Sequence, residues 1–317
     1  MKTVVVGFRS DFTLDAHAWQ RLKDKFQQDY HFYSLADCTD STLKDTEIFI
    51  GWPSDDTLKK MPHLHWLQLP SAGANNFSEN PNVAQDVIVT NASGVFNTAG
   101  AEHIVALMLA FTRQLKYYAI QTANHQWQRH DVERQLEGST VTIIGLGNIG
   151  QATAKRLDAF GAHIIGVKRS LSACPPYVQT LFTINEIQKA VAGSDYVVNI
   201  LPFTEETAHL FDATFFASCK RGAIFINAGR GASVVQQDLV SALKSGQIGG
   251  AGLDVTDPEP LPDTDPLWTF DNVLITSHSL GLSPSKDEKF IALLVDNLQR
   301  YRDRQPLQNK VNRRLGY

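Results

Sequence analysis

Cysteine is scarce in this sequence, and potential metal ligands are scattered. The 317 residues include three cysteines, Cys38, Cys174 and Cys219, which lie far apart and form no CxxC pair. We therefore expect no disulfide framework and a reducing, cytoplasmic compartment. His63 and His65 lie two residues apart, but no cysteine, aspartate or third histidine is near them. We expect no metal site.

Long apolar runs and an excess of one charge are also missing. The longest apolar stretch, Ile104–Phe111, is far shorter than the roughly 20 residues that span a bilayer. The N-terminal run Val4–Val6 is too short for the core of a signal peptide. Lysine and arginine number 29 against 33 acids, and a net charge of −4 does not indicate binding to nucleic acid or a membrane. The length suggests about two globular domains.

Short β-branched runs alternate with helical patterns along almost the whole chain. Asp15–Phe26 has apolar residues at helical spacing. This alternation predicts βαβ units built around parallel sheets. The strands expected in the first part are Thr3–Phe8, His31–Leu35, Glu47–Trp52, His65–Leu69 and Val87–Thr90.

The pattern changes near residue 97. Thr98–Ala123 has a long helical pattern that is more apolar than a one-sided surface helix requires. A second series of strands then runs from Val141–Ile144 to Val273–Thr276, and its strands are almost continuously apolar. Such runs are typical of a parallel sheet covered on both faces. A helix over Phe290–Tyr301 follows. We expect two α/β domains with different tasks.

The strongest local motif is GxGxxG at Gly145–Gly150. It follows the expected strand Val141–Ile144 and opens an expected helix, Gln151–Phe160, which Gly161 can end. In a dinucleotide site, Gly145 permits the tight turn, Gly147 lets the pyrophosphate approach the backbone, and Gly150 allows close packing of helix and strand. The helix N-terminus, at Asn148 and Ile149, offers free N–H groups to phosphate. A glycine-rich turn without a ligand is the alternative, and the surrounding strand and helix favour the cofactor.

The residues after the next strand indicate which cofactor binds. An NAD site places an acid there, whereas this chain has Lys168, Arg169 and Ser170 after His163–Val167. Two cations and a hydroxyl suit a 2′-phosphate. The alternative is a solvated basic loop. We predict that NADP(H) is preferred over NAD(H).

Three polar residues follow other strands of the second series, where ligands bind in such sheets. Arg230 follows Ala223–Asn227, Glu259 follows Gly249–Val255 and His278 follows Val273–Thr276. A guanidinium can bind a substrate carboxylate, an imidazole can transfer a proton, and a carboxylate can orient the imidazole. Each residue alone also has a structural interpretation, as a surface anchor, a proline turn and a structural histidine. Together they predict a catalytic trio.

With these motifs in place, the sequence resembles the D-isomer-specific 2-hydroxyacid dehydrogenase family. Where the family usually has an acid, this chain has Lys168. In this respect it resembles the NADP-using glyoxylate/hydroxypyruvate reductase branch. Ser279 and Leu280 depart from the smaller or β-branched residues usual in the histidine motif. The matching pieces are Gly145–Gly150, Val198–Thr207, Asn227–Gly231, Gly252–Pro262 and His278–Gly281.

The resemblance implies a fold of two Rossmann-like or flavodoxin-like, doubly wound parallel-sheet domains with the active-site cleft between them. Residues 1–97, completed by 283–317, would form the substrate domain, and residues 98–282 the NAD(P)-binding domain. The family's catalytic trio maps to Arg230, Glu259 and His278. Its substrate-binding backbone amides map to Ala72 and Gly73. Thr98–Ala123 would link the domains and pack in a homodimer; the alternative is a helix buried inside one chain. Further cofactor contacts would come from Leu201, Pro202, Thr207, Ala228, Asp254 and Gly281.

The function expected from these residues is NADPH-dependent reduction of a small 2-keto acid to the D-2-hydroxy acid, with His278 as proton donor. Glyoxylate, hydroxypyruvate and short branched keto acids all fit. A nucleotide-sensing protein like the corepressors that share this fold is the alternative, although this chain has no long polar tail of the corepressor kind. Formate oxidation is disfavoured because formate enzymes have glutamine where this chain has Glu259.

Overall fold

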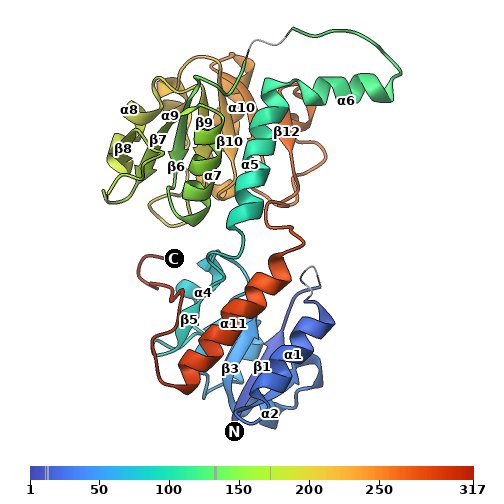
Figure 1. The fold of residues 1–317 in the computed structure, drawn as a ribbon, viewed down its shortest axis with the longest axis vertical. Coiled ribbons are helices and arrows are strands. Elements are labelled where there is room, and N and C mark those ends of the chain that lie inside the picture. Colours follow the sequence, from blue (N-terminus) through green and yellow to red (C-terminus); the bar gives the residue numbers. More distant parts are fainter. Residues whose placement is uncertain (11, 13, 132–133, 172) are drawn as a thin grey trace. The chain divides into compact units, whose positions relative to one another are not determined.

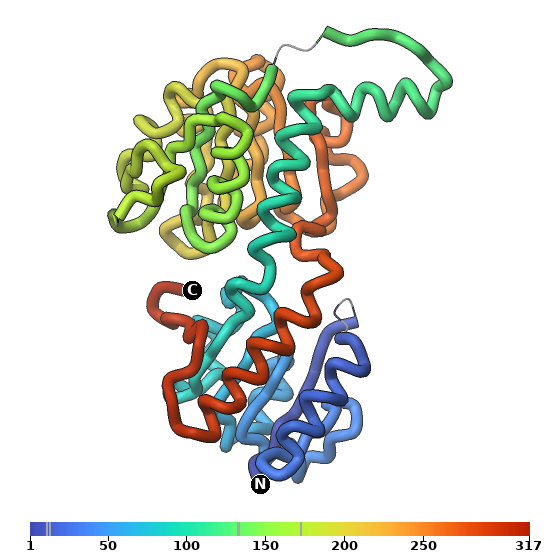
Figure 2. Tube along the Cα trace, viewed as in Figure 1, coloured from blue at the N-terminus to red at the C-terminus, as the bar shows by residue number. Residues whose placement is uncertain are grey.

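The computed structural model describes residues 1–10, 12, 14–131, 134–171 and 173–317. The chain divides into two compact units, Met1–Phe96 with Ser283–Tyr317, and Asn97–Leu282. Each unit contains a parallel sheet with helices on both faces, so the predicted α/β class is confirmed (Figure 1). The tube in Figure 2 shows that the first unit combines the N-terminal part of the chain with the C-terminal part.

The first unit has a five-stranded sheet in the order β2-β1-β3-β4-β5, with every pair of neighbouring strands parallel. Its strands are β1 (Lys2–Gly7), β2 (Tyr30–Ser34), β3 (Thr46–Gly51), β4 (Trp66–Gln68) and β5 (Ile88–Thr90). Its helices are α1 (Ala16–Phe26), η1 (Leu35–Asp37), α2 (Asp40–Lys44), α3 (Asp55–Lys59), α4 (Asn75–Ser78) and α11 (Lys286–Arg302).

Helices α1 and α11 close one face of this sheet. Asp15 caps α1 by accepting a hydrogen bond from the Ala18 N–H at 2.7 Å, which satisfies a donor that the first turn leaves free. The apolar stripe of α1 packs with that of α11 over the strands, while α2, α3 and α4 contribute to a second core on the other face. The first of these cores is centred on Leu22, Phe26, Ile48, Trp66, Phe290, Leu294 and Leu298.

The second unit has a seven-stranded sheet in the order β12-β11-β10-β9-β6-β7-β8, again with parallel neighbours. Its strands are β6 (Thr140–Ile144), β7 (His163–Lys168), β8 (Thr180–Thr183), β9 (Tyr196–Asn199), β10 (Ala223–Asn227), β11 (Ile248–Leu253) and β12 (Val273–Ile275). Its helices are α5 (Asn97–Thr112), α6 (Leu115–Ala123), α7 (Asn148–Ala159), η2 (Ile184–Glu186), α8 (Ile187–Val191), α9 (Ala213–Ser218), η3 (Gly231–Ser233), α10 (Gln236–Lys244) and η4 (Pro266–Thr269).

The central strands of this sheet are buried on both faces. Every residue of β9 and of β10 is buried, which explains why their sequences are apolar without alternation. Helices α5 and α7 cover one face, and α8, α9 and α10 cover the other. Because all the strands run in the same direction, their carboxyl ends share one edge of the sheet.

The helical pattern over Thr98–Ala123 is interrupted, contrary to the expectation of one long helix. Helix α5 ends at Thr112, and Gln114 takes a left-handed backbone conformation, with φ of 55°, before α6 begins. Lys116, in the first turn of α6, donates to the carbonyl oxygens of Phe270 at 2.7 Å and Val273 at 2.9 Å. The break directs α6 toward these carbonyls, and nothing in the apolar spacing signals it.

The cysteines, the apolar helices and the potential metal ligands can also be located in the structure. Cys38, Cys174 and Cys219 are free thiols. Across the described part of the chain, no helix is both long enough and apolar enough to cross a bilayer. Over the same residues, no group of three histidine, cysteine or acidic side chains is arranged to hold a metal ion.

Candidate functional site

The predicted site residues of the second unit follow the carboxyl ends of its strands. The glycine loop follows β6, Lys168 ends β7, and the segment with Leu201, Pro202 and Thr207 follows β9. Ala228 and Arg230 follow β10, Asp254 and Glu259 follow β11, and His278 and Gly281 follow β12. The fold therefore brings together, at one edge of one sheet, residues that lie far apart in the sequence.

The three glycines of the loop differ in their surroundings. Gly145 has φ of +102°, and a Cβ there would lie 2.8 Å from the Ile200 carbonyl carbon. A Cβ on Gly150 would collide with the Gly145 carbonyl oxygen, which shows how closely helix and turn pack. A Cβ on Gly147 would meet no atom within 4 Å. Gly145 and Gly150 are thus required by the protein itself, whereas Gly147 borders open space.

This open space lies at the start of helix α7. Gly147 is the N-cap residue, and no side chain caps the helix there. The first turn of a helix has N–H groups without a partner inside the helix, and the positive end of the helix dipole favours an anion. Gly161 follows the helix in a left-handed conformation, with φ of +73°, and ends it as predicted from the sequence. A tight turn, an open glycine and an uncapped helix fit the pyrophosphate of a dinucleotide.

The basic segment lies at the next strand end. Lys168 is the last residue of β7 and is half-buried, while Arg169 and Ser170 are exposed. This is the place where an acid would contact the 2′-hydroxyl of NAD. The charges at this position suit a phosphate instead.

Arg230 sits on a backbone that buried polar side chains hold. Asn227 donates to the Arg230 carbonyl oxygen at 3.2 Å, and Ser233 donates to it at 2.6 Å. Asn199 in turn donates to both Asn227 and Ser233. The loop also lies close to the segment that leads to Glu259, because a Cβ on Gly231 would collide with the Thr256 carbonyl. None of these supporting residues was predicted.

Charge and burial oppose each other at Arg230. Burial lowers the pKa of the guanidinium, and the negative charge of Glu259 acts in the opposite direction. Arg230 is therefore a desolvated cation, and a guanidinium in such a place is suited to bind a small anion such as a carboxylate.

Glu259 and His278 form a direct pair. The distance from His278 Nδ1 to Glu259 Oε2 is 2.9 Å, and both side chains are partly exposed, 51% for the histidine and 39% for the acid. The other carboxylate oxygen, Oε1, accepts a hydrogen bond from the Thr256 N–H at 3.2 Å. The pair leaves the other ring nitrogen of His278, Nε2, to act on a ligand.

Asp254 is buried beneath the turn that bears His278. Its side chain is 1% exposed and accepts hydrogen bonds from Thr276 Oγ1 at 2.8 Å, the Ser279 N–H at 2.9 Å and the Leu280 N–H at 3.2 Å. Burial raises the pKa of this carboxyl, but hydrogen bonds from His103, Thr276 and Ser279 outweigh it, so the pKa lies below its ordinary value. Neither His103 nor Thr276 was predicted to be part of the site.

The remaining predicted contacts lie on well-held loops. Thr207 Oγ1 donates to the Pro202 carbonyl oxygen at 2.8 Å, and the Leu201 N–H donates to Asn199 Oδ1 at 3.0 Å. The Ala228 N–H donates to the Asn199 carbonyl oxygen at 2.9 Å. The departure at Leu280 has a local explanation, since a Cβ on Gly100 would lie 3.0 Å from Leu280 Cδ2. Leu280 thus packs against the glycine of α5.

In the first unit, Ala72 and Gly73 lie in the loop between β4 and α4. The Ala72 carbonyl oxygen accepts a hydrogen bond from Asn91 Nδ2 at 2.8 Å, and the Gly73 carbonyl oxygen accepts one from Ser71 Oγ at 2.7 Å. Trp52 Nε1 donates to Ser71 Oγ at 3.4 Å. The loop is therefore fixed through its carbonyl groups.

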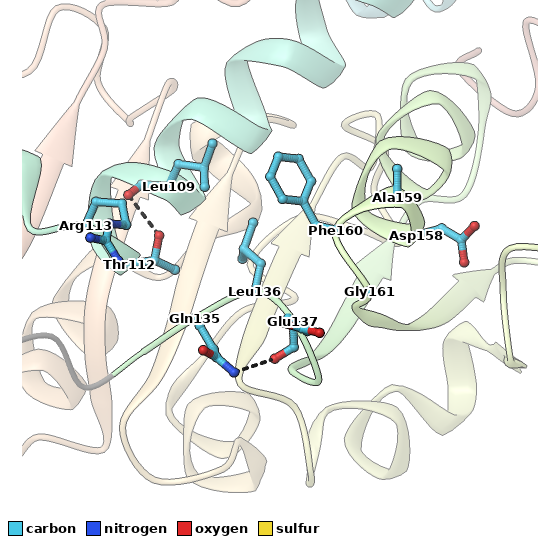
Figure 3. Close-up of a pocket in the computed structure, with 10 residues that line it drawn as sticks. All are labelled: Leu109, Thr112, Arg113, Gln135, Leu136, Glu137, Asp158, Ala159, Phe160 and Gly161. Carbon is cyan, nitrogen blue, oxygen red and sulfur yellow. Dashed lines mark hydrogen bonds between the residues drawn. The ribbon is translucent and has the colours of Figure 1, made fainter.

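A groove of about 590 Å³ lies at the opposite, amino edge of the second sheet. Apolar side chains, including the ring of Phe160, line it together with charged ones (Figure 3). It shares no residue with the predicted site, and open sheets of this kind bind ligands at the carboxyl edge. The groove is lined by Leu109, Thr112, Arg113, Gln135, Leu136, Glu137, Asp158, Ala159, Phe160 and Gly161.

Comparison with known proteins gives consistent matches. The family model for the D-isomer specific 2-hydroxyacid dehydrogenase, NAD binding domain, matches residues 105–279. Glyoxylate/hydroxypyruvate reductase B of Escherichia fergusonii is 34% identical over 254 residues, which cover 77% of this chain and 76% of that protein. D-3-phosphoglycerate dehydrogenase of Mycobacterium leprae is 35% identical over 238 residues, 73% of this chain but only 43% of that protein. The crystal structure of an NADPH-dependent glyoxylate/hydroxypyruvate reductase from Sinorhizobium meliloti, in complex with NADP and sulfate, has a TM-score of 0.86 and 26% identity, with all of both chains covered.

Proposed function

Because the chain belongs to the D-isomer specific 2-hydroxyacid dehydrogenase family, we propose that it reduces a small 2-keto acid of the glyoxylate or hydroxypyruvate type to the D-2-hydroxy acid, with NADPH. The observation that carries this proposal is the His278–Glu259 pair, 2.9 Å apart, at the sheet edge that also bears the glycine loop. The Escherichia relative and the Sinorhizobium structure, both named as glyoxylate/hydroxypyruvate reductases, support the substrate class.

His278 donates the proton in this proposal. Glu259 accepts a hydrogen bond from Nδ1 and stabilises the imidazolium, while Nε2 gives its proton to the oxygen of the keto group. When bound, the reduced nicotinamide supplies the hydride to the keto carbon. The hydride adds to the carbon and the proton to the oxygen, which converts the carbonyl to a hydroxyl and leaves the oxidised nicotinamide and a neutral His278.

Arg230 and the backbone N–H groups of Ala72 and Gly73 bind the carboxylate of the substrate. A guanidinium that is partly desolvated gives a strong, directional interaction with such an anion. Holding the carboxylate at fixed donors orients the keto group, which determines which face is reduced. The residues that would hold the cofactor are Gly145, Gly147, Asn148, Ile149, Gly150, Leu201, Pro202, Thr207, Ala228, Asp254 and Gly281.

A screen of 2-keto acids tests the proposed reaction. Purified protein is incubated with NADPH and glyoxylate, hydroxypyruvate or pyruvate, and the absorbance of the reduced nicotinamide is followed. We expect turnover of at least one of them, with D configuration in any chiral product. His278→Gln should lower kcat by about 10²–10⁴-fold, because it removes the proton donor. Arg230→Lys should chiefly raise KM, because the bidentate contact is lost. Absence of turnover with every keto acid would overturn the proposal.

Lys168, Arg169 and Ser170 bind the 2′-phosphate of NADPH in this proposal. We expect kcat/KM to be higher with NADPH than with NADH. Replacing Lys168 by Asp and Arg169 by Ala should reverse the preference, because an acid repels the phosphate and accepts from a ribose hydroxyl. The kcat/KM ratio for the two cofactors measures this. A ratio at or below one for the unaltered protein would contradict the assignment.

We infer further that two copies of the chain associate through helix α6 and the segment after it. Gln121 is the only buried residue of α6, although the helix is apolar on average. Leu115 and Ile120 are about half exposed, and Trp127 is fully exposed. Helix α6 extends away from the body of the second unit (Figure 1), and the exposed Leu115, Ile120 and Trp127 offer an apolar surface to a partner.

We also propose a reducing, cytoplasmic location, which the three free thiols support.

A further inference from the structure

Helix α5 contributes one histidine to the edge that bears His278. His103 Nε2 lies 2.8 Å from Thr276 Oγ1 and 3.3 Å from Asp254 Oδ1, and its side chain is 19% exposed. His103 and Thr276 are separated by 173 residues in the sequence. The contact therefore joins the helix to the end of β12, immediately before the turn with the proposed proton donor.

The direction of these hydrogen bonds follows from the number of donors. Thr276 Oγ1 donates its single hydrogen to Asp254 Oδ1, so it must accept from His103. His103 therefore has its proton on Nε2, where it serves both the hydroxyl oxygen and the carboxylate. A side chain without an N–H at this position would leave Thr276 and Asp254 with one donor fewer.

Asp254 in turn holds the turn on both sides of His278. Its backbone carbonyl oxygen accepts from the His278 N–H at 2.8 Å, and its carboxylate accepts from the N–H groups of Ser279 and Leu280. His278 has φ of 50°, a left-handed conformation that is uncommon for residues other than glycine. Such a conformation persists where surrounding contacts impose it.

We propose that His103 is a positioning residue: through Thr276 and Asp254 it fixes the turn that presents His278 to the keto group. This inference rests on the proposed role of His278 as proton donor. It assigns no contact with the substrate to His103 itself. The consequence is that a change in α5 alters the chemical step while leaving the nucleotide loop intact.

Three variants test this positioning role. His103→Leu removes the N–H and keeps an apolar side chain of similar bulk, whereas His103→Gln restores an N–H at a similar reach. His163→Leu, at the exposed start of β7, is the matched control. Hydrogen exchange of the segment 277–282, followed by mass spectrometry, reports directly on the Ser279 and Leu280 amides.

We expect exchange in this segment to accelerate about three- to tenfold in His103→Leu, in keeping with the loss of a hydrogen bond to a buried acceptor. His103→Gln should restore slower exchange, and His163→Leu should match the unaltered protein. An unchanged exchange rate in His103→Leu would overturn the inference. This measurement requires no turnover, so it remains decisive even if the keto-acid screen refutes the proposed function.

Kinetics separate positioning from a general loss of stability. In His103→Leu we expect kcat to fall about 10- to 100-fold, as small displacements of a reacting group do. The dissociation constant of NADPH should change by a much smaller factor, because Asp254 is only one of the many residues proposed to hold the cofactor. His103→Gln should recover most of the lost kcat. If kcat is unchanged in His103→Leu, or if NADPH binding weakens in parallel and glutamine rescues neither, His103 has no positioning role.

Discussion

Gly147 borders open space, whereas Gly145 and Gly150 are enclosed by backbone. A methyl group at Gly147 would therefore disturb no protein atom but would occupy the place proposed for the pyrophosphate. We expect Gly147→Ala to fold with an unchanged melting temperature and to bind NADPH about tenfold more weakly or worse, as overpacking of 1–3 kcal/mol implies. Isothermal titration calorimetry measures the affinity.

Gly193→Ala is the matched control, because a Cβ at Gly193 also meets nothing within 4 Å and lies far from the loop in sequence. It should leave both stability and NADPH affinity unchanged. Equal affinity of Gly147→Ala and the unaltered protein would show that the pyrophosphate does not lie against this glycine.

Asp254 links stability to pH through its hydrogen bonds. The pKa of Asp254 in the folded protein is lowered from its ordinary value of 3.8. Its ionised form therefore stabilises the fold at pH values above 3.8, and this stabilisation is lost as the pH falls through the lowered pKa. Asp254→Asn should lower the free energy of unfolding by about 1.5–3 kcal/mol at pH 7, since the donors lose a charged acceptor. The difference in the free energy of unfolding between Asp254→Asn and the unaltered protein should become smaller below about pH 4.

Urea unfolding at a series of pH values checks this prediction, with exposed Asp158→Asn as the control. A deficit that stays constant from pH 7 to pH 3 would mean that the charge on Asp254 contributes nothing to stability.

The glycine loop was predictable from sequence because its requirements are local, a turn and a helix start within six residues. The side chains that hold the polar site residues in place by hydrogen bonds could not be predicted in this way. Asn199 reaches Ser233 across 34 positions, and His103 reaches Thr276 across 173. Such contacts depend on which strands become neighbours, and no spacing rule reports that for single side chains.

Lys116 attaches helix α6 to the loop before β12 and to the strand itself. Burial lowers the pKa of its amine, and Nζ donates to two carbonyl oxygens. Lys116→Met should lower the free energy of unfolding by about 1–3 kcal/mol, because both carbonyl groups lose their donor in a part-buried place. Thermal unfolding measures the loss. Exposed Lys155→Met on α7 should have no comparable effect, and equal stability of the two variants would refute the anchoring role.

Strands with strong apolar character were predicted closely, and Ala223–Asn227 agrees with β10 at both ends. Elements without such character were missed or shortened. Helix α11 begins at Lys286, four residues before the predicted Phe290, because its first turn is polar. The break at Gln114 was missed because neither glycine nor proline marks it; a distant pair of carbonyl groups sets the position of α6 instead.

Assembly through α6 predicts a particle of about twice the 35.2 kDa chain mass at micromolar concentration, measurable by light scattering. Replacing Ile120 and Trp127 together by serine should give monomers with an unchanged circular dichroism spectrum, because both side chains are exposed in the single chain. Tyr33→Ser, an exposed aromatic of the first unit, is the control and should stay dimeric. A monomeric unaltered protein would contradict the inferred association.

The first unit is built from two stretches of chain that are separated by the whole second unit. During synthesis, the face of its sheet that carries Ile48 and Trp66 therefore waits for α11, whose Phe290, Leu294 and Leu298 complete that core. At rates of about 5–20 residues per second, the wait lasts about 10 to 40 seconds. The second unit is synthesised during that interval and can fold before the first unit is complete. Until α11 emerges, the uncovered apolar residues of the first unit are open to aggregation.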